Sequence, residues 1–372
     1  MRTKYALTRR SFLKKTAAVA AGALAAPQVV PSSVLGNPAR AAASERITVG
    51  WIGTGHRGSA VMGEFLGQKD VQVVAACDVN RQALDAAKRQ IDGRHGGGAC
   101  TVYKDFRDLV ARKDIDAVLV ASTDHWHVLH SIAAARAGKD VYCEKPMGLS
   151  LAECKALREA VRRGQRVFQF GTQQRSDGKF RLACELARNE RIGKLQAINV
   201  WSPGSSSGGP TDVVPVPEGL DYDFWLGPAP LKPYTRDRST NQWWWFISDY
   251  ALGFIAGWGI HPMDIAAWGA GDKLDGTVEV EGKGDFPKDG LCDTATNWRV
   301  AMRFSSGLTI QFDGTPKREE WTKRYPRSES HGTAFEGTEG WVHVHRGLIN
   351  SSPEGLVRSE IGPQGIRLDR SE

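Results

Sequence analysis

The sequence predicts an α/β fold in which a doubly wound parallel sheet precedes an α+β domain with a mostly antiparallel sheet. Between residues 47 and 143, short apolar segments alternate with helical patterns, as in right-handed β-α-β crossovers. Strand patterns gather late in the chain, between residues 276 and 345, which favours an antiparallel sheet. We expect the first domain at residues 44–150, the second at 151–350 and a polar tail at 351–372.

The net charge of the chain is concentrated in its first residues. The 372 residues include 49 Lys and Arg against 42 Asp and Glu, for a net charge of +7. Seven of the basic residues lie in residues 1–43, which contain no acidic residue, so the rest of the chain is balanced. This balance argues against nucleic acid as a partner. The 41% hydrophobic content is enough for a folded core and excludes intrinsic disorder.

Residues 1–43 have the pattern of a bacterial twin-arginine signal. The pair Arg9-Arg10 precedes a weakly apolar run at residues 16–30, and small residues follow up to residue 43. A membrane anchor is the alternative, but the run is short and is broken by Pro27. We therefore predict recognition by the twin-arginine translocase, export to the periplasm in the folded state and no stable membrane insertion.

A glycine-rich turn follows the first predicted strand, residues 47–52, and precedes a predicted helix, residues 59–66. A G-x-G-x-x-G turn between a strand and a helix is the fingerprint of a dinucleotide-binding Rossmann domain. The helix N-terminus and the backbone N–H groups of the turn suit a pyrophosphate. The predicted cofactor contacts are Gly53, Gly55, His56, Arg57 and Gly58.

Asp78 follows the second predicted strand, residues 71–77. A carboxylate at this position accepts hydrogen bonds from ribose hydroxyls and repels a 2′-phosphate, which favours NAD over NADP. Arg81 lies close enough to weaken this preference. The sequence therefore predicts NAD as the cofactor, with NADP less favoured.

The alternation continues to the end of the first domain. We expect helices at 81–91, 105–111 and 128–137, and strands at 117–121 and 140–143. Ligands of such sheets bind beyond the carboxyl ends of the strands. Two polar segments lie at such ends, residues 122–127 and 144–146.

These two segments, Thr123-Asp124-His125-Trp126-His127 and Glu144-Lys145-Pro146, resemble motifs of the Gfo/Idh/MocA family of oxidoreductases. Further stretches at residues 171–175, 223–228 and 257–264 are similar to its exported, twin-arginine branch. The resemblance covers about residues 45–345. It implies an NAD(P)-dependent oxidoreductase in which Lys145 holds the reacting hydroxyl and helps to move its proton. It also implies cofactor contacts from Thr123, His125, His127, Glu144 and Lys145, with Glu144 tuning Lys145.

The second domain is predicted to form one wall of the active site. Its expected helices are 151–163 and 179–189, and residues 203–217 are expected to form a long loop. Its expected strands are 166–170, 195–202, 276–282, 294–304, 308–313 and 341–345. Trp residues cluster at positions 225, 243–245, 258 and 268, and we expect part of this set to contact a sugar and part to pack in the core.

The resemblance implies that His261 is the second catalytic residue, acting as an acid–base partner of the substrate hydroxyl. A structural histidine at a helix start is the alternative. The resemblance also implies substrate contacts from Arg175, Trp258 and Asp264. Many dehydrogenases of the family have an Asp four residues before this His, whereas this chain has Gly257.

Export constrains the mechanism, because the periplasm offers no free NAD(H) pool. One scheme is a sugar oxidoreductase with a tightly bound, internally recycled cofactor. Another is an NAD-dependent glycosidase or lyase that oxidises a sugar hydroxyl, eliminates the glycosidic substituent and then reduces the oxidised sugar again. The short polar C-terminus and Gly257 leave open a third, a truncated sugar- or nucleotide-binding protein without turnover. No metal site is predicted, and the family resemblance favours a homo-oligomer.

Overall fold

The computed structural model describes residues 41–315 and 317–369. The export signal predicted for residues 1–43 lies almost wholly outside them and stays a prediction. Of the described residues, 41–46 and 68–71 form a small unit of their own, in which the amide of Ala41 donates to the carbonyl of Lys69 at 3.0 Å. The other unit comprises residues 47–67, 72–315 and 317–369.

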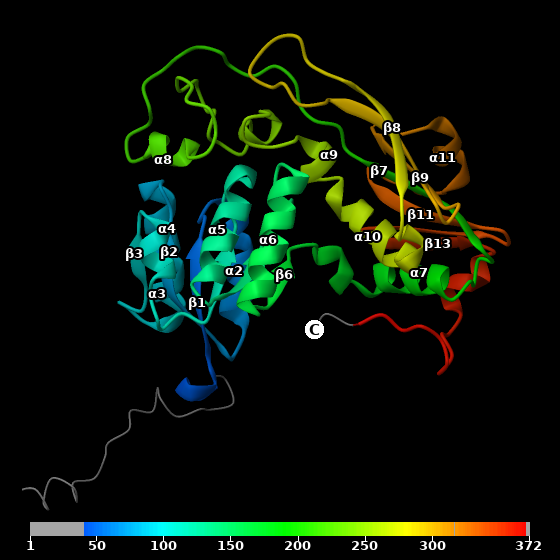
Figure 1. The fold of residues 1–372 in the computed structure, drawn as a ribbon, viewed down its shortest axis with the longest axis horizontal. Coiled ribbons are helices and arrows are strands. Elements are labelled where there is room, and N and C mark those ends of the chain that lie inside the picture. The colour runs from blue at the N-terminus through cyan, green and yellow to red at the C-terminus, as the bar shows by residue number, and fades with distance from the viewer. Residues whose placement is uncertain (1–40, 316, 370–372) are drawn as a thin grey trace, which may run out of the picture. The chain divides into compact units, whose positions relative to one another are not determined.

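The first sheet is parallel and has the strand order β3-β2-β1-β4-β5-β6 (Figure 1). This order confirms the predicted doubly wound sheet. The order of the strands reverses between β1 and β4, and this topological switch point is where such sheets bind ligands. The three-residue β3 was not predicted because it is too short to show a pattern, and the strand expected at 166–170 in the second domain instead pairs with β5 in this first sheet. The strands are β1 Ile47–Ile52, β2 Val71–Cys77, β3 Thr101–Tyr103, β4 Ala117–Val120, β5 Asp140–Cys143 and β6 Phe168–Phe170.

Helices lie against this sheet, with a core that includes Leu109, Val118 and Val141 (Figure 1). The helix expected at 128–137 begins four residues earlier, because Thr123 takes the extended N-cap conformation and Asp124 suits the positive N-terminus of a helix. The first turn of α5 therefore contains the polar motif expected before the helix. The helices are α2 His56–Gly67, α3 Arg81–His95, α4 Phe106–Val110, α5 Asp124–Arg136 and α6 Leu151–Gly164.

The second sheet has the order β13-β12-β11-β7-β10-β9-β8 and is antiparallel except for the β7–β10 pair. Its mostly antiparallel character was predicted, but β11 and β13 were not. Strand β11 is bounded by glycines and β13 is short and polar, so neither shows an apolar alternation. The strands are β7 Leu195–Ser202, β8 Val278–Asp285, β9 Asn297–Phe304, β10 Thr309–Gly314, β11 Gly332–Gly337, β12 Trp341–His345 and β13 Leu348–Ser352.

Two helices of the second domain, α7 and α10, pack on this sheet. Buried Phe180, Ile265 and Phe335 belong to their shared core, which stabilises the start of α10 where His261 lies. The remaining helices are short. The helices are α7 Gly178–Arg188, α8 Tyr222–Leu226, α9 Phe254–Gly257, α10 Ile260–Ala270 and α11 Glu319–Arg324.

Residues 213–251, here called the strap, run from the second sheet back across one end of the parallel sheet and carry α8 (Figure 1). The amide of Arg81 donates to the carbonyl of Gly219 at 2.9 Å, and that of Asp221 donates to Val79 at 3.0 Å. At the start of α5, the amide of His125 donates to the carbonyl of Tyr250 at 3.1 Å. Backbone hydrogen bonds therefore fasten the strap to the first domain at two separate strand ends.

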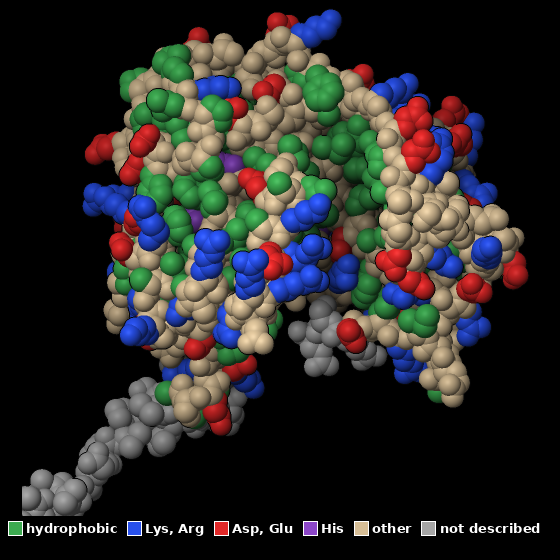
Figure 2. Space-filling model, viewed as in Figure 1, with side chains coloured by type: hydrophobic (Ala, Val, Ile, Leu, Met, Phe, Trp, Pro, Cys, Tyr) green, Lys and Arg blue, Asp and Glu red, His purple; other side chains and the backbone are tan. Residues whose placement is uncertain are grey.

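The surface mixes charges of both signs. Figure 2 shows Lys and Arg side chains interspersed with Asp and Glu on one face, with no broad area of a single sign. Within the described residues, no helix is both long and apolar enough to cross a membrane. All six cysteines are free thiols, and five of them are buried.

Candidate functional site

The glycine-rich turn has the close packing that a dinucleotide cradle requires. Gly53 has a φ of +85°, and a Cβ there would lie 2.3 Å from the amide nitrogen of Ser122 at the end of β4. A Cβ at Gly58 would lie 2.1 Å from the carbonyl oxygen of Gly53, so only glycine lets α2 approach the turn. A Cβ at Gly55 would meet no atom within 4 Å. The turn is thus packed from behind and open where a pyrophosphate would lie.

Asp78 lies at the carboxyl end of β2, beside this turn. Its Oδ2 accepts hydrogen bonds from the amide and hydroxyl of Thr54 at 2.6 and 2.9 Å, and its Oδ1 accepts one from the amide of Asn80 at 2.8 Å. Burial raises the pKa of Asp78, and these hydrogen bonds oppose that effect. The carboxylate is held rigidly where a ribose would reach it, so its position fits NAD.

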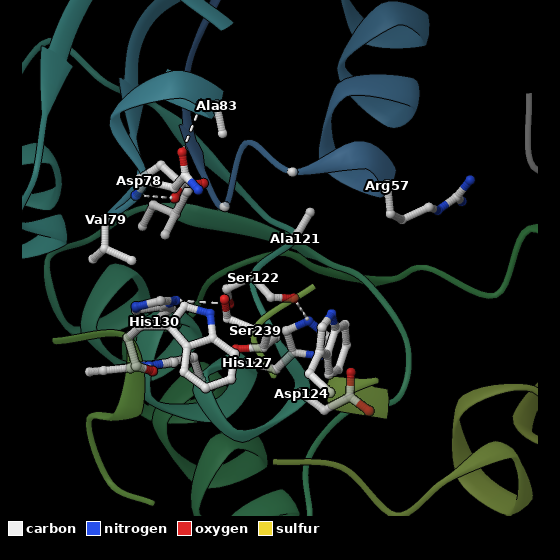
Figure 3. A pocket seen from close by; sticks show the side chains of 18 of the residues that line it. Arg57, Asp78, Val79, Ala83, Ala121, Ser122, Asp124, His127, His130 and Ser239 are labelled. Atoms are coloured by element: carbon white, nitrogen blue, oxygen red, sulfur yellow. Dashed lines mark hydrogen bonds between the residues drawn. The ribbon is translucent and has the colours of Figure 1, made fainter. Parts of the chain in front are cut away.

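A cavity lies at these strand ends, and Figure 3 shows Asp78 and Arg57 pointing away from each other on either side of the turn. The strap forms its other wall with Leu220, Phe224, Trp225, Ser239, Asn241, Trp244 and Trp245. Of the predicted cofactor residues, the cavity is lined by Gly53, Gly55, His56, Arg57, Asp78, Thr123, His127, Glu144 and Lys145. The cavity therefore lies between the first domain and the strap.

Two predicted cofactor residues, Gly58 and His125, do not line the cavity. The Nε2 atom of His125 lies 3.1 Å from the carbonyl oxygen of Trp225, so this histidine contacts the strap. His127 lines the cavity but is buried, with Nδ1 2.6 Å from the carbonyl oxygen of Pro146 and Nε2 3.0 Å from that of Ser122. His127 therefore joins the ends of β4 and β5 and positions the segment that carries Lys145.

Lys145 follows β5, and its side chain is only 8% exposed. Its Nζ donates to the carbonyl oxygen of Gly257 at 3.0 Å and lies 4.6 Å from the ring centroid of Trp245. Burial lowers the pKa of Lys145, while the nearby Asp124 and Glu144 act in the opposite direction. The Lys145–Pro146 bond is cis, as the family resemblance implies. An amine with a lowered pKa can accept a proton near neutral pH.

Glu144 contacts Lys145 through the backbone. Its Oε2 accepts from the amide of Lys145 at 3.2 Å, while its Oε1 accepts from Arg57 at 2.9 Å and from Gln173 at 2.7 Å. These bonds satisfy the buried carboxylate and tie the glycine turn to the end of β5. Glu144 therefore positions the backbone of Lys145 and contributes negative charge beside its amine.

Asp124 was not selected from the sequence, although it belongs to the polar motif after β4. It is 5% exposed and lines the cavity near Lys145. Burial raises the pKa of Asp124 to about 8, with Lys145 opposing the shift. Perturbed acids in cavities are frequently functional. The sequence signal that could have identified Asp124 was an acidic residue in the first turn of the helix after β4, near the end of the next strand, which carries Lys145.

His261 begins α10 and is 5% exposed. Burial, followed by the charges of Lys145 and Arg346, lowers the pKa of His261 to about 2. Its Nδ1 is buried without a hydrogen-bond partner among the described residues. The ring centroids of His261 and Trp258 lie 5.6 Å apart. Neutral His261 can exchange hydrogen bonds with a substrate, but it resists protonation.

Arg175 and Asp264, both predicted to bind substrate, bind each other. The guanidinium donates to both carboxylate oxygens at 2.7 Å, and it lies 5.1 Å from the ring centroid of Trp268. Neither residue lines the cavity. This bidentate pair joins the segment after β6 to α10 and so helps to position His261.

The tryptophans divide between core and site. Trp225 and Trp244 are buried in the aromatic core of the strap, although both reach the cavity. Trp245 lies against Lys145, and Trp258 lies beside His261. Trp245 lines the cavity together with Lys145, whereas the predicted site residues Trp258 and His261 are not among the described residues that line it.

Two family models together match most of the chain. Residues 47–172 match the NAD-binding Rossmann fold of the GFO/IDH/MocA oxidoreductase family, and residues 201–355 match its C-terminal α/β domain. The chain belongs to the Gfo/Idh/MocA oxidoreductase family. Membership confirms the resemblance found in the sequence and identifies the chain as an NAD(P)-dependent oxidoreductase with an NAD-binding domain. It does not determine the choice between NAD and NADP.

Curated Gfo/Idh/MocA relatives include enzymes of two kinds. The chain is 28% identical to a myo-inositol 2-dehydrogenase of Thermotoga maritima over 272 residues, covering 72% of this chain and 68% of that protein. It is 30% identical to a glycosyl hydrolase family 109 protein of a Shewanella species over 173 residues, covering 42% of this chain. The second match spans only 38% of that relative's length.

Solved structures support the fold. The WlbA dehydrogenase of Bordetella pertussis, in complex with NADH and UDP-GlcNAcA, superposes with a TM-score of 0.61 at 19% identity. The match covers 81% of this chain and 74% of that one. An apo scyllo-inositol dehydrogenase of Lactobacillus casei gives a TM-score of 0.57 at 20% identity. The fold of this chain is therefore similar to that of these two dehydrogenases over most of its length.

Proposed function

We propose that this protein is an exported oxidoreductase that oxidises a hydroxyl of a sugar or glycoside with tightly bound, internally recycled NAD. The observation that carries the proposal is the strap, which lines the dinucleotide cavity opposite the glycine-rich turn. A cofactor held between the first domain and the strap would leave slowly, as an enzyme without a surrounding NAD pool requires. The similarity to myo-inositol 2-dehydrogenase supports a polyhydroxylated substrate.

The residues of the cavity fit NAD. The open side of Gly55 and the N-terminus of α2 suit a pyrophosphate, and the carboxylate of Asp78 suits ribose hydroxyls. When bound, NAD+ accepts hydride from a carbinol carbon. Lys145 and Glu144 line the same cavity at the end of β5, where a hydroxyl substrate would meet the reactive ring.

Lys145 is proposed to hold the reacting hydroxyl oxygen and to take its proton. Its amine is buried, and burial lowers its pKa, so it loses its proton more readily than an exposed lysine and can then act as a base. His261 is a weaker base because its pKa falls to about 2, so it is proposed to orient the hydroxyl by a hydrogen bond. Asp124 lies near Lys145, and negative charge on its carboxyl would favour the charged form of the amine.

The proposed periplasmic location of the enzyme rests on the predicted twin-arginine signal. Arg9-Arg10 and the apolar run that follows support export through the translocase, which carries folded proteins. The enzyme would thus acquire its cofactor before export and work in the periplasm. Reduction of a second sugar-derived carbonyl would return the cofactor to its starting state.

The alternative is an NAD-dependent glycosidase or lyase. The similarity to a glycosyl hydrolase family 109 protein favours it, as does Gly257 at a position where polyol dehydrogenases of the family have an Asp. Oxidation of a sugar hydroxyl would acidify a neighbouring C–H, and elimination would then release the aglycone before reduction. The two functions share Lys145 and differ in their products.

Turnover without added dinucleotide tests the proposal. The purified protein is incubated with pairs of an aldose and a ketose, or with aryl glycosides, and the products are separated by chromatography. Oxidised and reduced sugars in equal amounts are expected for the oxidoreductase, and free aglycone without net redox change for the alternative. Absence of any product from a wide panel, with NAD present in the protein, would contradict both functions and leave a binding protein.

A further inference from the structure

Arg346 brings a positive charge from the end of the second sheet to the catalytic residues. It lies in the turn between β12 and β13, and its guanidinium carbon lies 4.9 Å from the ring centroid of Trp258. The same ring lies 5.6 Å from the ring of His261 and 4.5 Å from that of His331. The ring of Trp258 therefore contacts both the Arg346 guanidinium and the ring of His261.

The positive charges of three side chains act on His261. The charges of Lys145, Arg346 and Arg57 all act, after burial, to lower the pKa of His261. Burial and the charge of Arg57 also lower the pKa of Arg346 itself. Because these positive charges lower the pKa values of their neighbours, they act on a common region around His261. An added negative charge would be stabilised in this region.

The three cations of this region differ in the partners that their charged groups bind. Arg57 is paired with Glu144 at 2.9 Å, and the Nζ of Lys145 donates to the carbonyl oxygen of Gly257. Asp124 supplies little negative charge near neutral pH, because burial raises its pKa to about 8. Within residues 41–315 and 317–369, no carboxylate forms an ion pair with Arg346. Its guanidinium thus keeps its hydrogen-bond donors for a ligand.

A metal ion does not explain the neighbouring histidines. Glu329, His331 and His345 offer ligand atoms within 4.8 Å of one another. However, Nδ1 of His345 lies 2.9 Å from the carbonyl oxygen of Arg346, and its Nε2 lies 3.1 Å from that of Arg327. Both ring nitrogens face acceptors, so neither presents a lone pair to a metal. The contact to its carbonyl instead fixes the backbone of Arg346.

We propose that the substrate carries an anionic substituent, a carboxylate or a phosphate on the sugar, and that Arg346 binds it. A guanidinium presents a planar pair of donors that matches the oxygens of either group, and Trp258 holds it in place. Arg346 then selects acidic sugars over neutral ones, while Lys145 and His261 act on the hydroxyl. This inference rests on the proposed function, because it concerns the substrate of the same site.

Calorimetric titration of the cofactor-loaded protein with matched sugars tests the inference. The probes are glucose, glucuronate and glucose 6-phosphate, which share a ring and differ in charge. We expect one of the two anions to bind about tenfold or more tightly than glucose, as a charge-assisted contact implies. In Arg346→Gln that ratio should fall toward unity, and in Arg346→Lys part of it should remain.

The matched control is Arg163→Gln on α6, because Arg163 is exposed and pairs only with Glu159 within its helix. This variant should keep the full preference for the anion. Equal affinities for charged and neutral sugars, or a preference that survives in Arg346→Gln, would overturn the inference. An anion preference that depends on Arg346 in a protein without redox turnover would keep the inference and reject the proposed function. Turnover of neutral sugars without any preference for an anion would keep the proposed function and reject the inference.

Discussion

The ammonium of Lys145 donates a hydrogen bond to the backbone carbonyl oxygen of Gly257 at a distance of 3.0 Å. The contact joins the end of β5 to α9 and so connects the two domains at the catalytic residue. A carbonyl carries only a partial charge, so it stabilises the ammonium less than a carboxylate would. With glycine at this position, burial determines the pKa of Lys145.

Replacing Gly257 with Asp should raise the pKa of Lys145. A Cβ at Gly257 would meet only Trp245, at 3.9 Å, so the site accepts a side chain. The new carboxylate would favour the charged amine, so the fraction of neutral amine at pH 7 would fall. The rise of turnover with pH should therefore move to higher pH in a pH–rate profile. Gly257→Asn is the control of equal size, and an equal displacement in both variants would contradict an electrostatic effect.

Lys145→Met should abolish turnover without releasing the cofactor. The substitution removes the amine but keeps an apolar stem against Trp245. Loss of a general acid–base group typically costs about 10²–10⁴-fold in rate. Stopped-flow absorbance of the bound nicotinamide, with sugar added, measures the step. Retained turnover in Lys145→Met would remove Lys145 from the mechanism.

Gly227→Ala should open the strap and accelerate loss of the dinucleotide. Gly227 has a φ of +51°, and a Cβ there would lie 2.0 Å from the ring of Trp126 on α5. The strap or the ring must shift, which weakens the closure of the cavity. Gly307→Ala is the matched control, since Gly307 also has a positive φ of +87° but no atom within 4 Å of the added Cβ. Dissociation rates are compared by dialysis against a dinucleotide scavenger; equal rates would argue against closure by the strap.

Asp78→Ser should relax the preference for NAD. Removing the carboxylate removes both a partner for the ribose hydroxyls and the repulsion of a 2′-phosphate. The ratio of bound NADP to bound NAD, measured after refolding with equal amounts of both, should rise by roughly tenfold. An unchanged ratio would show that Arg81 or another group determines the preference.

Local sequence patterns were sufficient to predict the fold of the first domain and the positions of several site residues. Gly53, Gly58 and Asp78 stand at fixed distances from predicted strands, and the backbone geometry confirms the need for glycine at the first two. Lys145 was also placed by its position after a strand. In these cases, the sequence signal and its structural cause lie within about twenty residues of each other.

The contacts that complete the site join distant residues and were not predictable in this way. The strap lies roughly one hundred residues after the histidine that it contacts, and Arg346 follows Trp258 by a similar interval. The pairing of Arg175 with Asp264 likewise spans 89 positions. Strands β11 and β13 lack an apolar pattern, because their pairing partners in the sheet, not their own residues, determine their conformation.

The central claim, a cofactor that stays within the enzyme, is tested most directly by native mass spectrometry of the protein isolated in its folded state. The protein is exchanged extensively into volatile buffer without dinucleotide, and the mass of the intact chain is compared before and after denaturation. Added mass equal to NAD(H), released only on denaturation, is the expected result. A chain that carries no dinucleotide after exchange, while rebinding it readily from solution, would show that the cofactor exchanges freely.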